Sequence, residues 1–447
     1  MKLALAAGIA LVGNALPLTA AAEPVLLISI DGLQPADVIE AEKRGLAVPN
    51  LRRFVAQGTF ASGVIGNLPT VTYPSHTTLL TGTAPARHGI VGNTTFDPTQ
   101  INQAGWYWYA ADIKVPTLWD AAAKAGLTTA NVHWPVSVGA SSVRWNLPQI
   151  WRTGHDDDAR LLAALSSPGL LGELEADTEK YAPGIDESIA GDENRARFAV
   201  RLIGRYKPDF MTVYLTALDH EQHAFGPDTS QAHAVLARID RAVGDLVAAQ
   251  MAVHPGAVVA VVSDHGFAAT DTEINLFRPF VDAGLITLDG ENKVTGWEAM
   301  PWPSGGSIAV VLARPGDRQL VARVRGLLDR LRADPAARIE TIADADAIAA
   351  MGGNPQASFY INLDKGALAG GFKDAPAGLS RPARSKGMHG YFPAAATMRS
   401  SFMLMGKSIP AGRNLGEIDM RAIAPTLARI LKVSLPTAEL PPVSFAP

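Results

Sequence analysis

The sequence predicts an α/β fold, in which a doubly wound and mostly parallel sheet is flanked by helices and carries a small inserted lobe. Three apolar runs, at residues 25–30, 209–215 and 257–263, have the length and composition of strands buried on both faces. Helical patterns with one apolar face lie between these runs. Such alternation of strand and helix is typical of a doubly wound architecture.

The composition narrows the class of protein. The 447 residues suffice for a large core, and 47% of them are hydrophobic while 18% are charged. The formal net charge of −4 argues against a protein that coats nucleic acid, so no nucleic-acid-binding surface is expected. The chain has no cysteine, which excludes disulfides, thiol catalysis and cysteine-ligated metals.

The N-terminus predicts a signal peptide over residues 1–22. Lys2 precedes an apolar run, and small residues, Ala20 to Ala22, stand before Glu23. The run is short and interrupted, so no membrane span is expected after cleavage. We therefore expect residues 23–447 to form an exported catalytic domain, periplasmic or secreted. A cytosolic N-terminal helix or a retained anchor is the alternative, and the oligomeric state is not predicted.

The first half of the chain alternates strands and helices. The run 25–30 leads into Asp31, at the carboxyl end of a strand, where open α/β sheets bind ligands. Helices are expected over residues 51–58, from Ser75 onward, and over 116–126, with proline early and glycine at the end of the last. Residues 128–134 read as a strand, and the acidic segment 153–194 has a helical pattern.

The second half contains the inserted lobe. The strand at 209–215 ends near Asp219, a helical face spans 236–247, and the strand at 257–263 runs directly into Asp264 and His265. Between about 275 and 380 the sequence pattern changes, and it predicts short strands at 307–312 and 357–363 around a charged helix at 317–332. The pattern of the core returns with a strand at 401–405 and a helix at 420–431.

Thr72 is a candidate nucleophile. It lies between Pro69 and Pro74, which keep the backbone out of a regular helix until a helix begins after Pro74. A hydroxyl just before a helix N-terminus lies where unpaired N–H groups and the helix dipole favour an anion such as phosphate. A threonine in this position is also a common helix cap.

Acids and histidines at successive strand ends predict two metal sites. Asp219, His223 and His389 supply three ligands for one ion, whereas Asp31, Asp264, His265 and the Thr72 oxygen supply four for another. Oxygen and imidazole ligands without thiolate favour zinc, with manganese or iron as alternatives. Two ions roughly 4 Å apart can hold the attacking and leaving oxygens of an in-line phosphoryl displacement. Each pair alone could instead be a helix cap or an ion pair.

The order and spacing of these residues resemble those of the nucleotide pyrophosphatase/phosphodiesterase family, or type I phosphodiesterases, of the alkaline phosphatase superfamily. The resemblance covers nearly all of the mature chain and implies an alkaline-phosphatase-like fold. The residues that carry it are Ile30-Asp31-Gly32, Pro69-Thr-Val-Thr72-Tyr-Pro-Ser-His76, His88-Gly-Ile-Val-Gly-Asn93, Trp134-Pro-Val-Ser137, Asp219-His-Glu-Gln-His223 with Gly226-Pro227, Ser263-Asp-His-Gly266 and Gly387-Met-His-Gly-Tyr391.

The resemblance implies roles for individual residues. Thr72 would form a phosphothreonine intermediate, and Asn93 would donate, with the Thr72 backbone N–H, to a phosphate oxygen. Asp31, Asp264 and His265 would hold the ion that touches Thr72. Asp219, His223 and His389 would hold the ion that activates water.

The implied substrate-binding residues are Tyr73, Trp134 and Ile150. Tyr73 stands where the family carries an aromatic ring that stacks on a nucleotide base. Ile150 replaces the second aromatic of the family, which weakens the prediction of nucleotide preference. The aromatic cluster at 106–109 could compensate, or could form an apolar wall for a lipid or a choline-like group.

The sequence thus predicts a two-metal hydrolase of small phosphate diesters or pyrophosphates, with nucleotides as the expected class. A phosphomonoesterase is the alternative. It would need a cation beside the phosphate, for which Lys114, Arg144 and Arg152 are candidates by sequence proximity. A sulfatase is disfavoured because its formylglycine precursor motif is missing. A metal-bearing binding protein would be expected to lack a ligand or the nucleophile, yet all seven positions are filled.

Overall fold

A computed structural model describes residues 22–102, 105–176, 179–373 and 378–445. The predicted signal peptide lies outside the described residues, apart from its last position. Among the described residues, no helix combines the length and the apolarity needed to cross a membrane.

The core of the molecule is an eight-stranded sheet. Its strands pair in parallel, except that β19 runs antiparallel to both of its neighbours. In spatial order the strands are β20 (Arg413–Asn414), β2 (Thr59–Phe60), β19 (Phe402–Gly406), β7 (Val258–Val262), β1 (Val25–Ile30), β6 (Phe210–Leu215), β4 (Thr129–Val132) and β5 (Trp145–Leu147). The predicted mostly parallel α/β sheet is confirmed.

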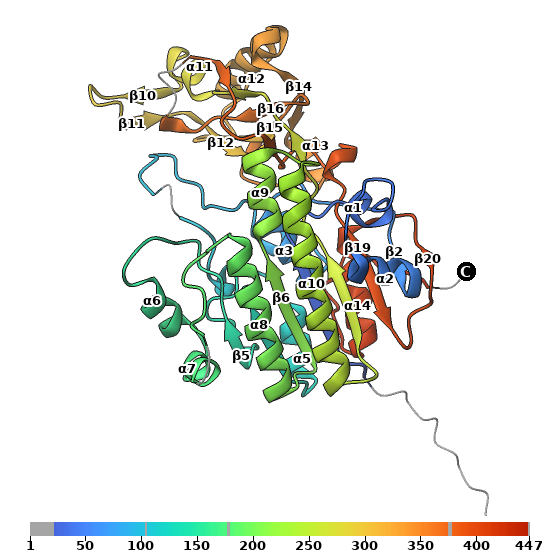
Figure 1. Ribbon diagram of the computed structural model, residues 1–447. Helices are drawn as coiled ribbons and strands as arrows, with labels where there is room; N and C mark the ends of the chain where they lie inside the picture. Colours follow the sequence, from blue (N-terminus) through green and yellow to red (C-terminus); the bar gives the residue numbers. More distant parts are fainter. Residues whose placement is uncertain (1–21, 103–104, 177–178, 374–377, 446–447) are drawn as a thin grey trace, which may run out of the picture.

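Helices cover both faces of this sheet. One face packs against α2 (Pro49–Gln57), α8 (Ile189–Tyr206) and α10 (Ser230–Val253), and the other against α3 (Thr72–Thr81), α5 (Leu118–Lys124) and α14 (Ile423–Leu431). Figure 1 shows α8 and α10 lying across the strands on the first face. In β1, Leu26 and Ile28 belong to the first core, whereas Val25 and Leu27 belong to the second. Burial on both faces explains why these strands read as unbroken apolar runs.

A second, antiparallel sheet lies beyond one end of the first (Figure 1). Its order is β12 (Ala299–Ser304), β13 (Ser307–Leu312), β15 (Ala357–Leu363) and β14 (Ile339–Asp344), and α12 (Arg318–Ala333) packs into the same hydrophobic cluster. The bounds of β13 and β15 agree with the sequence prediction. The limits of the inserted lobe, at about 275 and 380, stay predictions.

The shorter elements complete the chain. They are α1 (Pro35–Ile39), β3 (Gly63–Ile65), α4 (Pro85–His88), α6 (Asp158–Leu165), α7 (Leu170–Glu175), α9 (Ala217–Phe225), β8 (Ala268–Ala269), β9 (Thr272–Ile274), α11 (Phe277–Asp282), β10 (Ile286–Leu288), β11 (Val294–Trp297), α13 (Ala345–Ala350), β16 (Ala367–Ala369), β17 (Ser380–Pro382), β18 (Gly387–Met388) and β21 (Glu417–Asp419).

Two segments differ from the sequence prediction. Helix α3 begins at Thr72 instead of Ser75, because Pro74 falls in the first turn, where proline is tolerated. The acidic segment 153–194 is not one helix. Pro168 stands between α6 and α7, and Pro183 and Gly184 fall in the non-helical stretch that precedes α8.

Candidate active site

The central strands converge on the predicted metal ligands. β1 lies between β7 and β6, so the residues that follow these three strands meet at one edge of the sheet. Asp31 follows β1, Asp264 and His265 follow β7, and α9, which carries Asp219 and His223, begins two residues after β6. Parallel neighbours explain why residues more than two hundred positions apart become adjacent.

The first cluster comprises Asp31, Asp264 and His265. Each residue offers one ligand atom, and these atoms all lie within 4.8 Å of one another. His265 Nε2 is 3.3 Å from Asp31 Oδ1 and 3.1 Å from Asp264 Oδ2. Tyr214 donates its hydroxyl hydrogen to the other Asp31 oxygen, and Gly32 N donates to Asp264 Oδ1 at 3.2 Å.

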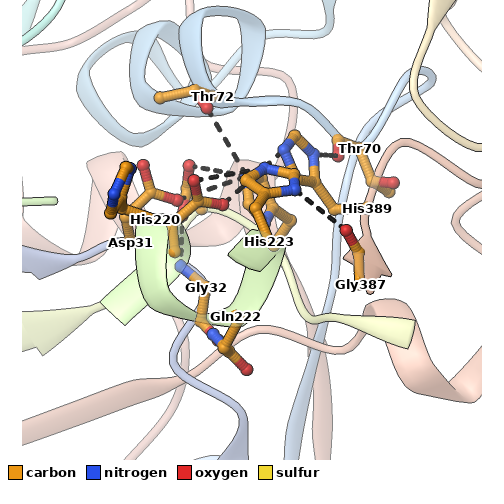
Figure 2. A network of polar contacts seen from close by, with 12 residues as sticks. Asp31, Gly32, Thr70, Thr72, His220, Gln222, His223, Gly387 and His389 are labelled. Atoms are coloured by element: carbon orange, nitrogen blue, oxygen red, sulfur yellow. Dashed lines mark hydrogen bonds and ion pairs between the residues drawn. The ribbon is translucent and has the colours of Figure 1, made fainter. Parts of the chain in front are cut away.

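The second cluster comprises Asp219, His223 and His389, again with ligand atoms within 4.8 Å. Nε2 of His223 lies 3.3 Å from Asp219 Oδ2, and Nε2 of His389 lies 3.6 Å from Asp219 Oδ1. The rings of His389 and His265 stack with their centroids 3.6 Å apart, so the two clusters are in contact. Figure 2 shows His223 and His389 converging beside Asp31 and below Thr72.

The three histidines share one orientation. Their Nδ1 atoms face backbone carbonyl oxygens: His223 faces Gly387 at 2.9 Å, and His389 faces Thr70 at 3.1 Å. His265 Nδ1 lies 3.1 Å from the oxygen of Gly266. An imidazole that donates through Nδ1 keeps a lone pair on Nε2. Each Nε2 therefore points a lone pair at a carboxylate, an arrangement that a cation between them would stabilise.

The electrostatics of the clusters also fit cations. Burial raises the pKa of Asp31 well above its usual range, with added repulsion from Asp219 and Asp264. Burial lowers the pKa of His265 to about 4 and that of His389 to about 3, so both rings are neutral at pH 7. For Asp219, burial raises the pKa but is outweighed by the nearby histidines, above all His223, and the net shift is downward.

Three buried carboxylate oxygens receive no hydrogen bond from any described residue. They are Asp31 Oδ1, Asp219 Oδ1 and Asp264 Oδ2. Unsatisfied buried oxygens are rare in folded proteins, and buried charges are normally paired or coordinate metals. The donor set, carboxylates with imidazoles and no thiolate, suits zinc, and these residues fit the two predicted metal sites.

Thr72 faces the first cluster. It is the first residue of α3, and its Oγ1 lies 3.5 Å from His265 Nε2. The helix N-terminus thus directs its positive end, with the Thr72 backbone N–H, toward the space in front of the hydroxyl. His76, one turn along, holds this start of the helix, with Nδ1 2.8 Å from the Thr72 carbonyl oxygen and Nε2 2.9 Å from Ser29 Oγ.

Asn93 lies beside the nucleophile. Its Oδ1 accepts a hydrogen bond of 2.9 Å from the backbone N–H of Tyr73, in the first turn of α3. This contact fixes the carboxamide plane and leaves Nδ2 as the donating end. The geometry suits the predicted contact between Asn93 and a phosphate oxygen.

His389 depends on the second sheet for its position. β18 pairs with β8, which brings His389 next to the segment after His265. Ser307 of β13 donates to the carbonyl oxygen of Gly390, a residue with φ of +86°. A Cβ at Gly390 would lie 1.9 Å from the Ser304 oxygen, so only glycine permits this close approach.

The aromatic residues near the site form one group that reaches the surface, whereas the other predicted substrate-binding residues are buried in the cores. The buried Tyr73 ring lies 5.2 Å from that of Trp106, which stacks on Trp151 at 3.9 Å, and both tryptophans are partly exposed. Trp134 and Ile150 are fully buried in the two hydrophobic cores. Their contact with substrate stays a prediction. Trp151, the residue after Ile150, is the one that stacks on Trp106.

The sequence did not predict the role of residues in α8, and in the stretch before it, that contact α9. Arg195 and Asp192 form a fully buried ion pair, and Glu187 contacts His220 on α9. The i,i+3 spacing of Asp192 and Arg195 was the only signal, and it is common on helix surfaces. Two of the three cations considered for a monoesterase have other partners: Arg152 pairs with Asp157 and Asp158, and Arg144 lies over the Trp145 ring.

Comparison with known proteins identifies the family. A model of the type I phosphodiesterase / nucleotide pyrophosphatase family matches residues 25–356. The chain belongs to this family. The predicted family is therefore confirmed, and the match begins with β1 and contains every proposed site residue except His389, which lies beyond it.

Curated relatives are distant. A pyrophosphatase/phosphodiesterase of Schizosaccharomyces pombe is 26% identical over 287 residues, which cover 63% of this chain and 50% of that protein. The human bis(5'-adenosyl)-triphosphatase ENPP4 is 26% identical over 258 residues, which cover 56% and 49% of the two chains. This chain spans half or less of the length of these relatives.

The solved structures agree in fold. Human ectonucleotide pyrophosphatase/phosphodiesterase 5 superimposes with a TM-score of 0.66 at 19% identity, covering 95% of this chain and 98% of that one. An inactive threonine-to-alanine variant of the murine protein, in complex with AMP, gives a TM-score of 0.65. The predicted alkaline-phosphatase-like fold is confirmed.

Proposed function

We propose that the protein is a two-metal hydrolase of phosphate diesters or pyrophosphates that acts through a phosphothreonine at Thr72. The observation that carries this function is the position of Thr72 Oγ1, at a helix N-terminus and 3.5 Å from the Nε2 lone pair of His265 in one of two adjoining ligand clusters. Zinc is the expected metal. When bound, the ions would increase the acidity of the threonine hydroxyl and of water and stabilise charge on the transferred group.

The residues divide the chemistry between two steps. Thr72 Oγ1 forms the bond to phosphorus while the ester bond on the opposite side breaks. Asn93 Nδ2 and the Thr72 backbone N–H at the start of α3 stabilise the charge that develops on the phosphoryl oxygens. Water then displaces the threonine oxygen, which releases a phosphomonoester and restores the hydroxyl group.

Nucleotides are the expected substrate class. The proposal draws on the names of the relatives, on the AMP complex of the murine protein, and on the Tyr73–Trp106–Trp151 group, in which the two partly exposed tryptophans offer a surface for a base. A monoesterase is the second candidate, because the superfamily contains both activities. It is disfavoured because two of its three candidate cations, Arg144 and Arg152, are engaged with other partners.

A substrate panel tests this function. We expect zinc-reconstituted protein to hydrolyse bis-p-nitrophenyl phosphate and a p-nitrophenyl nucleotide diester with a higher kcat/KM than p-nitrophenyl phosphate, and to lose activity in chelator. Glycerophosphocholine, ATP and a dinucleotide complete the panel. A strong preference for the monoester would contradict the diesterase assignment. A complete lack of chelator-sensitive hydrolysis would favour a metal-bearing binding protein.

We also propose that the protein is exported, to the periplasm or beyond, after cleavage following Ala22. The support is the charged, apolar and small-residue pattern of residues 1–22. N-terminal sequencing of protein recovered from the producing cell should find Glu23 first. Recovery of intact Met1 or Lys2 from a cytosolic fraction would contradict export.

A further inference from the structure

Glu187 brings a carboxylate to the side of the active site. It lies in the stretch before α8, and its side chain is 22% exposed. Its Oε2 is 3.7 Å from Nδ1 of His220, which follows Asp219 on α9. His220 lies at the edge of the network in Figure 2. Glu187 is neither part of a ligand cluster nor assigned a role in the proposed reaction.

The Glu187 carboxylate also affects Tyr73, one of the predicted substrate-binding residues. Burial raises the pKa of the Tyr73 phenol well above its usual range, and Glu187 adds to this shift. The Tyr73 hydroxyl is buried and forms no hydrogen bond with a described residue. Glu187 therefore contacts the neighbour of the metal ligand Asp219, and its charge acts on the neighbour of the nucleophile Thr72.

The stretch that carries Glu187 is tied to the aromatic group. Ile185 N donates to the Arg152 carbonyl oxygen at 2.9 Å, next to Trp151. Gly184 has φ of +62°, and a Cβ there would lie 2.1 Å from the same oxygen. This contact needs glycine, and it places the residues before Glu187 against the segment that supplies one ring of the Tyr73–Trp106–Trp151 group.

Arg195 binds the backbone of the stretch that precedes Glu187. This side chain is fully buried and donates through Nη2 to the carbonyl oxygens of Ile185 and Asp186. Its Nη1 donates to Asp192 Oδ1 at 2.8 Å and to Thr216 Oγ1 at 3.2 Å. A guanidinium with several buried acceptors has a fixed orientation, so the backbone before Glu187 is fixed as well.

Asp192 extends this support to the metal-ligand helix. Its two oxygens accept hydrogen bonds from Thr216 N at 3.0 Å and Ala217 N at 2.8 Å, at the start of α9. The Asp192–Arg195 pair therefore connects the base of the helix that carries Asp219 with the stretch that carries Glu187. The backbone that leads into Glu187 therefore has a defined position relative to the helix that carries Asp219.

We propose that Glu187 is a specificity-determining residue that disfavours substrates with negative charge beyond the reacting phosphodiester. This selectivity rests on the proposed function, because it concerns the substrate of the same site. Two like charges a few ångströms apart in a partly buried site repel strongly enough to change affinity about tenfold or more. Glu187 would favour monoanionic diesters over polyphosphates and over nucleotides with a second phosphate group.

A matched substrate pair tests this selectivity. The pair is the p-nitrophenyl ester of thymidine 5′-phosphate with and without a 3′-phosphate, assayed with zinc-loaded protein. We expect the 3′-phosphate to lower kcat/KM in the wild type. Glu187→Gln should reduce this penalty by about tenfold. Glu193→Gln, which removes a carboxylate that pairs with Arg238 on the outer face, should keep the wild-type ratio.

Binding provides a readout that does not need turnover. Calorimetry with thymidine 5′-phosphate and thymidine 3′,5′-bisphosphate should show the same change in ratio for Glu187→Gln. Hydrolysis by the wild type with equal ratios in wild type and Glu187→Gln would overturn the role of Glu187. No hydrolysis by the wild type, with a binding ratio that still shifts in Glu187→Gln, would instead contradict the proposed function and leave charge selection by Glu187 supported.

Discussion

Thr72→Ala should lower the turnover of a phosphodiester by about 10⁴-fold or more, because the nucleophile is lost while the ligand clusters remain. Thr72 Oγ1 is 3.5 Å from His265, but the ligand atoms of Asp31, Asp264 and His265 already lie within 4.8 Å of one another without it. Metal content should therefore change little. Steady-state kinetics and atomic emission on the same preparation measure both quantities.

Thr72→Ser is the matched control for this variant. It keeps the hydroxyl at the first position of α3 and should retain a substantial part of the activity. Acid quenching during turnover of a phosphorus-labelled substrate should trap phosphothreonine in the wild type and phosphoserine in Thr72→Ser. Wild-type activity in Thr72→Ala, or label on another residue, would contradict the assignment of the nucleophile.

The central sheet could be predicted because each strand carries its own signal. β1, β6 and β7 are buried on both faces, so their sequences are unbroken apolar runs, and the polar residues that follow them stand out. Strand order does not need to be known for this inference, because the carboxyl ends of neighbouring parallel strands lie at one edge. The grouping of Asp31, Asp264 and His265 follows from that rule.

The position of His389 does not follow from the rule about the carboxyl ends of parallel strands. It follows the two-residue strand β18, whose pairing with β8 has no sequence pattern of its own. A count of ligands placed it with Asp219 and His223, and no pattern predicted the strand pairing that brings it there. Asn93 was predicted by the resemblance to the family alone, because its contact with the backbone of Tyr73 joins two turns and depends on the path of the chain between them.

The sequence did not predict the buried residues that support the site through contacts with distant segments. Arg195 is fully buried, yet an arginine in a helix is usually predicted to be exposed. Its burial depends on carbonyl oxygens of Ile185 and Asp186, which belong to a segment that the sequence pattern placed in a helix. Pro183 and Gly184 were the available evidence against that helix.

His389→Ala should lower the zinc content of the protein from about two ions per chain to about one, and should reduce turnover strongly. His389 supplies one of three ligands of the second cluster, and Asp219 and His223 alone hold an ion less tightly. The first cluster keeps its three ligands and Thr72. Metal analysis after extensive dialysis, together with zinc titration by calorimetry, would show one weakened site and one intact site.

The stacking of His389 on His265, at 3.6 Å, requires a second variant. Alanine at position 389 removes the ring that packs on a ligand of the first cluster, so it could weaken both sites through packing alone. His389→Gln keeps more of the volume but lacks the imidazole, and it should show the same loss of one ion.

The control variant is His233→Ala. It removes a histidine of α10 that lies near Asp228, and it should keep both ions. Two tightly bound ions in both His389 variants would exclude His389 as a ligand. One remaining ion in His389→Gln would separate the ligand role of the imidazole from its packing on His265.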